Sequence, residues 1–334
     1  MAPGPSFASF WAHFFPQKPK FTDKDLPDLH GKVYIVTGSN TGLGKEVARI
    51  LYDKNAKVYI AARSEEKAKT AIEEIQKKTP SSKGSLVFLH LDLNDLEKTK
   101  AAAQEFLSKE DKLHVLFNNA GVMVTPAEPP PKTAQGYELS IGVNNVATFL
   151  FTKLLTPTLV ATAKTEPPNT VRVVWLTSFG LELYAHEGVG LPTDNLDYHV
   201  PKPATDRYGL SKVGVWALGV EFARRYKGDG IVSVPINPGN LRTELARDQG
   251  LKLKLIAGLF CYPVPNGAFT ALFAALSPSI STETDFTEKW VIPFGRIEPL
   301  RPDLPKAAKL EPEGGTGGAQ KFWEWDEEQV KNYL

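Results

Sequence analysis

The sequence predicts an α/β fold, in which a single doubly wound domain is built on a seven-stranded parallel sheet with the strand order 3-2-1-4-5-6-7. From residue 31 onward, short Val-rich runs of strand length alternate with longer segments of helical periodicity. These runs are continuously apolar, which is typical of parallel strands covered by helices on both faces. The expected strands are KVYIVTG, KVYIAAR, SLVFLHLDL, LHVLFNNAG, TVRVVWLTS, IVSVPINPG and KWVIPFG.

The segments between the expected strands have the pattern of crossover helices. In LGKEVARILYDKN one helix face is apolar, formed by Leu43, Val47, Ile50 and Leu51. SEEKAKTAIEEIQKK continues the alternation. We therefore expect one doubly wound domain over residues 31–310, preceded by an aromatic extension over 1–30 and followed by an acidic, aromatic tail over 311–334.

The composition of the 334-residue chain excludes several classes of site and partner. A formal net charge of +1 leaves no excess of cations for the phosphates of a nucleic acid. The single cysteine, Cys261, excludes an intrachain disulfide, and the six histidines lack metal-ligand spacing, so no metal site is expected. No apolar run reaches 18 residues, so no transmembrane segment is expected, and a reducing, cytoplasmic setting fits best.

Both ends of the chain are rich in aromatic residues. The N-terminal stretch FASFWAHFFP lacks the basic region and cleavage site of a signal peptide. Packing across its own domain is the main interpretation, and weak peripheral contact with a membrane surface stays open. At the other end, EPEGGTGG reads as a hinge before KFWEWDEEQVKNYL, which we expect to dock through its two tryptophans.

A glycine-rich turn, TGSNTGLGK, follows the first expected strand and opens the first helix. Its glycines are Gly38, Gly42 and Gly44. A backbone without side chains can approach a pyrophosphate closely, and a helix N-terminus offers N–H groups and the positive end of its dipole. Because the turn lies in the strand–turn–helix context that this mechanism requires, it predicts a dinucleotide site in a Rossmann domain.

The end of the second expected strand indicates which dinucleotide is bound. It reads IAARSEE, with alanines where a carboxylate would hold a ribose 2′-hydroxyl, and then Arg63 and Ser64. A guanidinium and a hydroxyl match a 2′-phosphate, and Lys45 adds a second cation nearby. We therefore expect a preference for NADP(H); a plain solvated surface charge is the alternative for Arg63.

Two Tyr-x-x-x-Lys pairs occur in the sequence, Tyr198–Lys202 and Tyr208–Lys212. On a helix this spacing places both side chains on one face. Prolines at 201 and 203 disfavour a helical turn through the first pair, whereas the second lies in an uninterrupted helical pattern that Thr205 or Asp206 can cap. The second pair suits proton transfer, because a nearby ammonium lowers the pKa of a tyrosine from its usual ~10.

At these motifs the chain resembles the short-chain dehydrogenases/reductases, in the branch similar to retinol dehydrogenases, over about residues 30–300. The residues that carry the resemblance are the turn of the form TGxxxGxG, LDLND, NNAG, the YGLSK pair and INPGNLRT. The spacing of the turn glycines resembles that of reductases and differs from that of sugar epimerases. Ala147 and Thr177 depart from residues common in the family, and the segments WVIPFGRIEP and KFWEWDEEQV resemble fungal members, many of them reductases of secondary metabolism.

The resemblance implies a catalytic group and a cofactor site. In the catalytic group Tyr208 is the acid/base, Lys212 tunes it, Ser178 binds the substrate oxygen, and Asn144 holds a water that links Lys212 to solvent. The implied NADP(H)-binding positions are Gly38, Asn40, Thr41, Gly42, Leu43, Gly44, Arg63, Ser64, Asp92, Leu93, Asn119, Ala120, Gly121, Tyr208, Lys212, Pro238, Gly239 and Thr243. Asn145, next to Asn144, leaves that assignment open by one position.

The segments expected to border the cleft are rich in Leu, Phe and Tyr. They are the long connection after Ser178 and the segment that begins LRTELARDQG. We therefore expect a lipophilic or aromatic carbonyl or alcohol as the substrate, with simple packing as the alternative for these side chains. An NADP-binding protein without redox activity and a membrane-surface dehydrogenase of retinoid or sterol type are alternative functions, and either a monomer or a homodimer is compatible with the sequence.

Overall fold

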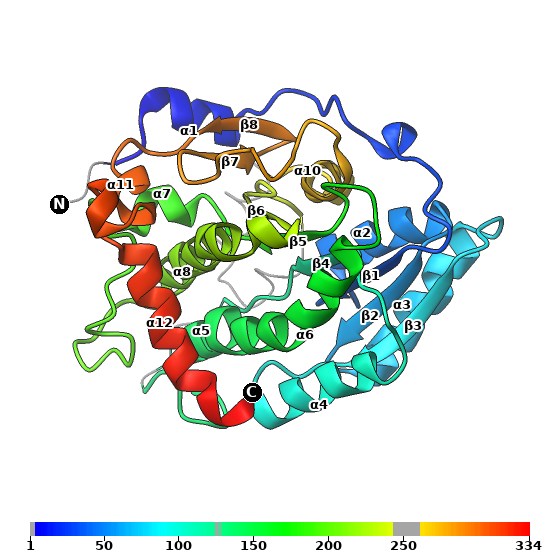
Figure 1. The fold of residues 1–334 in the computed structure, drawn as a ribbon, viewed down its shortest axis with the longest axis horizontal. Coiled ribbons are helices and arrows are strands. Elements are labelled where there is room, and N and C mark those ends of the chain that lie inside the picture. The colour runs from blue at the N-terminus through cyan, green and yellow to red at the C-terminus, as the bar shows by residue number, and fades with distance from the viewer. Residues whose placement is uncertain (1–3, 124–126, 128, 243–260) are drawn as a thin grey trace.

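The structure is a computed structural model that describes residues 4–123, 127, 129–242 and 261–334. One sheet runs through it with the strand order β3-β2-β1-β4-β5-β6-β7-β8 (Figure 1). The strands are β1 (Val33–Thr37), β2 (Lys57–Ala62), β3 (Ser85–His90), β4 (Val115–Asn118), β5 (Arg172–Leu176), β6 (Val232–Ile236), β7 (Lys289–Ile292) and β8 (Arg296–Pro299). The doubly wound fold and the predicted order of the first seven strands, all paired in parallel, are confirmed.

The eighth strand corrects the prediction of a seven-stranded, wholly parallel sheet. The predicted strand KWVIPFG is shorter than expected, because β7 ends at Ile292 and the chain then turns back. Gly295 in this turn has a φ of 78°, a left-handed conformation that glycine adopts readily. β8 therefore returns antiparallel to β7 and completes a hairpin at the edge of the sheet.

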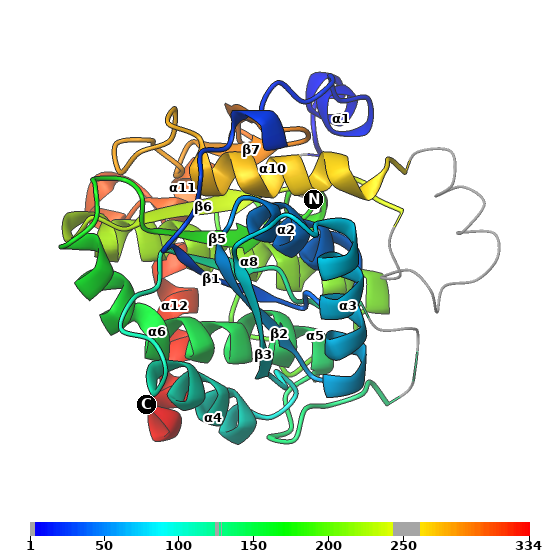
Figure 2. The same cartoon turned by 90° about the vertical axis from the view of Figure 1, so that its right-hand side faces the viewer.

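Helices cover both faces of the sheet, as Figures 1 and 2 show. One face carries α2, α3 and α10 and the other α4, α6 and α8, each with its own apolar core. The helices are α1 (Phe7–Phe14), α2 (Gly42–Asp53), α3 (Glu65–Lys78), α4 (Leu96–Leu107), α5 (Leu139–Ile141), α6 (Thr148–Ala163), α7 (Gly180–Tyr184), α8 (Ala204–Tyr226), α10 (Val264–Leu276), α11 (Leu304–Ala308) and α12 (Gly318–Val330). A π-helical turn, Gly142–Ala147, joins α5 to α6.

The continuous helical stretch Leu139–Ala163 is long and apolar enough to cross a membrane by length and composition alone. In its most apolar window, however, 61% is buried inside the protein. Phe149, Leu155 and Leu159 belong to the core beneath the sheet. The stretch therefore has the position of a core helix.

Both terminal segments pack on the central domain. The helix α1 lies over the β7–β8 hairpin (Figure 1), where Arg296 Nη2 donates to the carbonyl of Ala12 at 2.8 Å. The helix α12 packs against α8, with Trp323 fully buried and Trp325 partly buried. The glycines before α12, expected to form a hinge, form a hydrogen-bonded turn in which Gly315 N donates to the carbonyl of Leu310 at 2.9 Å.

Candidate active site

The glycine turn lies between β1 and α2, at the carboxyl end of the sheet. Gly38 and Gly42 have φ angles of 66° and 55°. At Gly44 an added Cβ would lie 2.5 Å from Asn119 Nδ2 and 2.8 Å from the carbonyl of Gly38, so only glycine fits. α2 begins after Thr41 with no side-chain cap, which leaves its first N–H groups for a ligand. These features fit the pyrophosphate of a dinucleotide.

A hydrogen-bonded clamp joins this turn to the end of β4. Thr37 Oγ1 accepts from the backbone N–H groups of Asn119 at 3.0 Å and Ala120 at 2.8 Å. Asn119 Nδ2 donates in return to the carbonyl of Thr37 at 2.6 Å. The predicted positions at Asn119–Gly121 are thus fixed directly beside the glycine turn.

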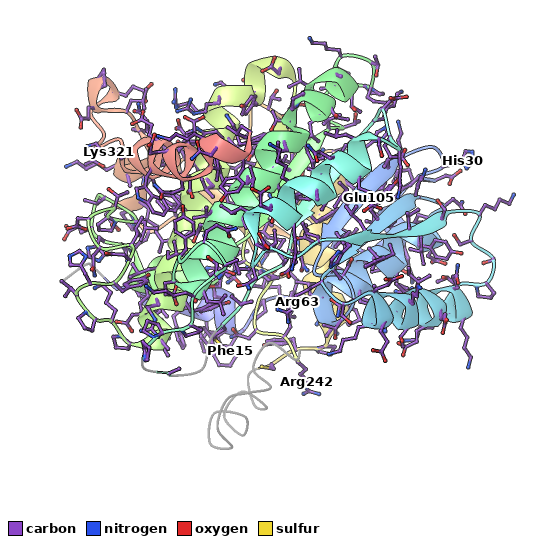
Figure 3. The ribbon with its side chains drawn as sticks, turned by 90° about the horizontal axis from the view of Figure 1, so that it is seen from below. Phe15, His30, Arg63, Glu105, Arg242 and Lys321 are labelled. Atoms are coloured by element: carbon purple, nitrogen blue, oxygen red, sulfur yellow. The ribbon has the colours of Figure 1, made fainter. Side chains whose placement is uncertain are left out.

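The side chains predicted to select the cofactor lie at the end of β2. Arg63 is exposed, and Figure 3 shows it above Arg242 in the view. Ser64 caps α3 by accepting from Lys67 N at 3.4 Å. Lys45 forms an ion pair with Glu74 of α3, so its charge is partly neutralised. Arg63 is therefore the main cation of this trio for a 2′-phosphate.

After β3, Asp92 and Leu93 occupy the predicted adenine side. Asp92 Oδ1 accepts from Asn94 N at 3.1 Å, and Oδ2 lies 3.7 Å from Lys98 Nζ. Leu93 is buried. The carboxylate thus organises its own turn, and its contact with the adenine stays a prediction.

Ser178, Tyr208 and Lys212 come together beyond the end of β5. A Cβ added at Gly180 would lie 2.9 Å from Ser178 Oγ and 3.4 Å from the Cα of Gly209, the residue after Tyr208, and Ser178 Oγ accepts from Gly180 N at 3.0 Å. Lys212 Nζ donates to the carbonyl of Leu176 at 2.9 Å and lies 5.8 Å from the centre of the Tyr208 ring. The three residues predicted to bind the substrate oxygen, donate the proton and tune the donor thus share one corner.

Burial governs the protonation of this corner in the protein alone. It raises the pKa of Tyr208 to about 12, which the hydrogen bond from Ser178 partly opposes. It also lowers the pKa of Lys212 to about 8. The expected lowering of the tyrosine pKa by Lys212 is not among the causes of this shift, in which burial dominates. A further positive charge, such as that of an oxidised nicotinamide, is therefore needed to stabilise the phenolate.

Asn144 lies in the π-helical turn and connects three segments. Its Oδ1 accepts from Val122 N at 2.8 Å, and its Nδ2 donates to Ser211 Oγ at 2.9 Å. A Cβ added at Gly121 would lie 3.1 Å from Lys212 Nζ and 3.3 Å from Asn144 Oδ1, so both groups face the same small space. The role of Asn144 in holding a relay water stays a prediction.

The neighbouring Asn145 points elsewhere. Its Nδ2 donates to the carbonyl of Ser211 at 3.0 Å, and a Cβ added at Gly214 would lie 2.5 Å from it. Asn145 therefore supports the packing of α8, whereas Asn144 faces Lys212.

The turn after β6 contains Pro238 and Gly239, and Gly239 has a φ of 93°. Asn237 Oδ1 accepts from Gly239 N at 3.0 Å and closes the turn. Because β5 and β6 are paired neighbours, this turn lies beside the segment that carries Ser178. The predicted contact at Thr243 lies outside the described residues.

The start of α8 corrects one expectation and supports another. The helix begins at Ala204, and its N-cap residue, Pro203, makes no side-chain capping hydrogen bond. Thr205 and Asp206 lie inside the first turn and do not cap the helix. Tyr198, of the rival pair, has a φ of 53° and lies outside any helix. Tyr198 and Lys202 therefore do not share a helix face.

A buried ion pair beside the site was missed by sequence reasoning. Arg207 Nε lies 3.4 Å from Glu138 Oε1, and both residues are buried. Glu138 also accepts from the N–H groups of Ser140 at 2.8 Å and Ile141 at 3.0 Å. The pair joins the residue before Tyr208 to the helical segment that carries Asn144, and no local motif signals it.

Comparisons with known proteins identify relatives along the whole chain. Residues 32–174 match the family described as short chain dehydrogenase. A short-chain dehydrogenase/reductase of Phomopsis amygdali is 52% identical, with 98% of each chain covered. The short-chain dehydrogenase/reductase bet4 of Neocamarosporium betae is 50% identical, with 98% of this chain and 94% of bet4 covered.

Solved structures share the fold at lower identity. The 3-ketoacyl-(acyl-carrier-protein) reductase of Brucella melitensis, complexed with NADH, is 22% identical, with a TM-score of 0.59 over 77% of this chain and 95% of that one. RhlG of Pseudomonas aeruginosa, in an active-site complex with NADP, is 21% identical, with a TM-score of 0.59 over 80% and 96%. At this identity the likeness supports the fold alone.

Proposed function

The chain belongs to the short-chain dehydrogenase/reductase family of oxidoreductases, and from this premise we propose that it interconverts a lipophilic or aromatic carbonyl and its alcohol with NADP(H). The observation that carries the proposal is the convergence of Ser178, Tyr208 and Lys212 next to the glycine turn. We also place the chain in the retinol-dehydrogenase-like branch and, from the C-terminal resemblance, among reductases of secondary metabolism in the cytoplasm.

A bound nicotinamide would supply the hydride for reduction of the carbonyl and accept it when the alcohol is oxidised. Ser178 orients and polarises the substrate oxygen. Tyr208 donates its phenolic proton to the developing alkoxide, so that a hydride and a proton together convert the carbonyl to the alcohol. Lys212 stabilises the phenolate left behind, and a water at Asn144 returns the proton from solvent.

Removing the phenol tests this assignment. We expect Tyr208→Phe to lower kcat by about 10² or more, since general acid catalysis contributes about 10²–10⁴, while NADPH still binds. The assay is a panel of carbonyls and alcohols followed by NADPH absorbance. A folded Tyr208→Phe enzyme that binds NADPH with unchanged turnover would remove Tyr208 from the mechanism.

The proposed NADP(H) preference rests on Arg63, which is exposed at the end of β2 where no carboxylate stands. A charge-assisted hydrogen bond contributes about 1.5–3 kcal/mol, so Arg63→Ala should lower the NADPH/NADH ratio of kcat/KM by about tenfold or more. An unchanged ratio would leave Arg63 as a surface charge. Lys67→Ala, four residues along on α3 and likewise exposed, is the matched control.

The lipophilic substrate class is supported by the residues after Ser178. Phe179 follows it directly, Leu183 is 51% exposed, and Tyr184 packs against Gly209 of α8. Much of the second predicted border segment, residues 243–260, lies outside the described residues.

A second candidate, a dehydrogenase that works at a membrane surface, is favoured by the outer side of α1. Phe7 is 80% exposed and Trp11 53% exposed, and aromatic side chains of this kind bind at membrane interfaces. Flotation with liposomes, repeated with Phe7→Ser/Trp11→Ser, tests it: loss of co-flotation in the variant supports it, and no flotation of the unmodified protein removes it.

A further inference from the structure

A buried histidine links the helix α1 to the turn that follows β6. His13 is the one residue of α1 that is fully buried, at 3% exposure. It lies 224 positions before Asn237, yet its Nδ1 is 2.8 Å from Asn237 Nδ2. Asn237 is the residue that closes the turn at Pro238 and Gly239.

The hydrogen bonds fix the roles of both side chains. Asn237 Oδ1 accepts from Gly239 N at 3.0 Å, so its Nδ2 is the donor that faces His13. His13 Nδ1 must then be the acceptor, and the ring proton sits on Nε2, which lies 4.0 Å from Glu182 Oε1. Burial and the nearby Arg296 lower the pKa of His13 to about 3, so the ring stays neutral and keeps this acceptor at physiological pH.

The same helix also contacts the segment that follows Ser178. The rings of His13 and Phe14 lie 4.9 and 5.2 Å from that of Phe179, which comes directly after Ser178. Ser9 Oγ donates to Glu182 of α7. α1 therefore holds both the turn after β6 and the loop after β5.

Those two segments are where hydride transfer must take place. The substrate oxygen has to reach Ser178 and Tyr208, so the nicotinamide ring must lie beside the end of β5. The neighbouring turn after β6 is one wall of that space, because β5 and β6 are paired up to Leu176 and Ile236. The ends of β2 and β3, which would hold the adenosine half, lie on the far side of β1 and its glycine turn from this wall.

We propose that His13 is a positioning residue, which acts through Asn237 to hold the turn at Pro238 and Gly239 in the shape that receives the nicotinamide half of the cofactor. This inference rests on the proposed function only in requiring that a pyridine dinucleotide binds. The helix α1 is thereby part of the active site of this chain and not a detachable extension.

The test compares two ligands that share the adenosine half. Dissociation constants for NADPH and for adenosine 2′,5′-bisphosphate are measured by calorimetry on purified full-length protein. His13→Phe keeps a ring against Phe179 and Trp290 but has no acceptor. We expect about tenfold weaker NADPH binding, as for loss of one hydrogen bond, and unchanged binding of the bisphosphate. His13→Asn, whose Oδ1 takes the position of Nδ1, should restore NADPH binding to within about twofold.

His114→Phe is the matched control. His114 is also buried, and its Nδ1 accepts from Val33 N at 2.9 Å, but it lies at the amino end of β4, away from the site. The His114→Phe substitution should destabilise the protein without changing the affinity for NADPH relative to that for adenosine 2′,5′-bisphosphate. Should His13→Phe not fold, His13→Met, which fills irregular space and accepts only weakly, replaces it with the same expected result.

Equal weakening of both ligands in the His13 variants, or no weakening of NADPH, would overturn the inference. If the unmodified protein binds NADPH and NADH no better than it binds a free nucleoside, the proposed function fails instead. The two failures are therefore distinguishable.

Discussion

Replacing Lys212 with methionine should abolish turnover and, at neutral pH, stabilise the fold. Lys212 is 5% exposed, and burial lowers its pKa from 10.5 to about 8. A lysine whose pKa is lower in the folded protein than in the unfolded chain reduces the free energy of unfolding at low and neutral pH. This penalty disappears once the pH exceeds the pKa of the lysine in the unfolded chain. A difference of about 2.5 pKa values corresponds to about 3 kcal/mol at pH 7 and to less than about 1 kcal/mol at pH 10.

Methionine removes this penalty but leaves the carbonyl of Leu176 without its donor, which costs about 1–2 kcal/mol. We therefore expect Lys212→Met to be more stable than the unmodified protein by about 1–2 kcal/mol at pH 7. The cost of losing the hydrogen bond to the carbonyl of Leu176 is the same at both pH values. The change in stability difference between pH 7 and pH 10 therefore reports only the cost of burying the Lys212 charge. The difference in free energy of unfolding that favours Lys212→Met at pH 7 should fall by about 2–2.5 kcal/mol and vanish or reverse by pH 10.

Urea denaturation of both proteins at pH 7 and pH 10 measures this difference. Lys202→Met is the control, because Lys202 belongs to the rival pair and lies outside α8. It should show neither the gain at pH 7 nor the loss of turnover. A Lys212→Met protein that is less stable at pH 7, or whose stability difference is the same at both pH values, would refute a buried, destabilising ammonium.

Three further predictions concern packing and buried charge. Burial raises the pKa of Asp326 well above its usual value, so Asp326→Asn should be more stable than the unmodified protein at pH 7. This gain should disappear at a pH below the usual pKa of aspartate, which urea denaturation at pH 7 and at that lower pH can measure. At Gly209 an added Cβ would lie 2.0 Å from the ring of Tyr184, so Gly209→Ala should lower kcat/KM about tenfold or more while NADPH affinity in calorimetry stays within about twofold. Trp323→Ala, which removes a fully buried ring 4.7 Å from Phe149, should cost about 3–5 kcal/mol in urea denaturation and leave the KM for NADPH unchanged.

The predictable part of the site consists of short motifs. The glycine turn and the Tyr208–Lys212 pair are each complete within nine residues, so their geometry follows from one turn or one helix face. Prolines on either side of Lys202 were sufficient to exclude the rival pair, and the structure has no helix there. The strand order followed because continuous apolar runs with crossover helices allow few topologies.

The parts that could not be predicted depend on contacts between distant segments. The bond from Asn237 to His13 spans 224 positions, and the Glu138–Arg207 pair joins two different helices. The β7–β8 hairpin was missed because the apolar run continues through Pro293 and Phe294 into the turn, where Gly295 reverses the chain. Periodicity detects the apolar run but not the point at which it bends.

The buried polar groups near the site have a common effect. Lys212, the Glu138–Arg207 pair and His13 are all removed from water, and burial of such groups rarely stabilises a fold by itself. Each one instead fixes a segment that carries chemistry: α8 at Tyr208, the π-helical turn at Asn144, and the turn after β6. Apolar substitutions at Lys212 should therefore be recovered readily in a search for greater stability and be lost in a search for turnover. Asp326, on α12, provides the contrast, because its replacement is expected to stabilise the protein without affecting the reaction.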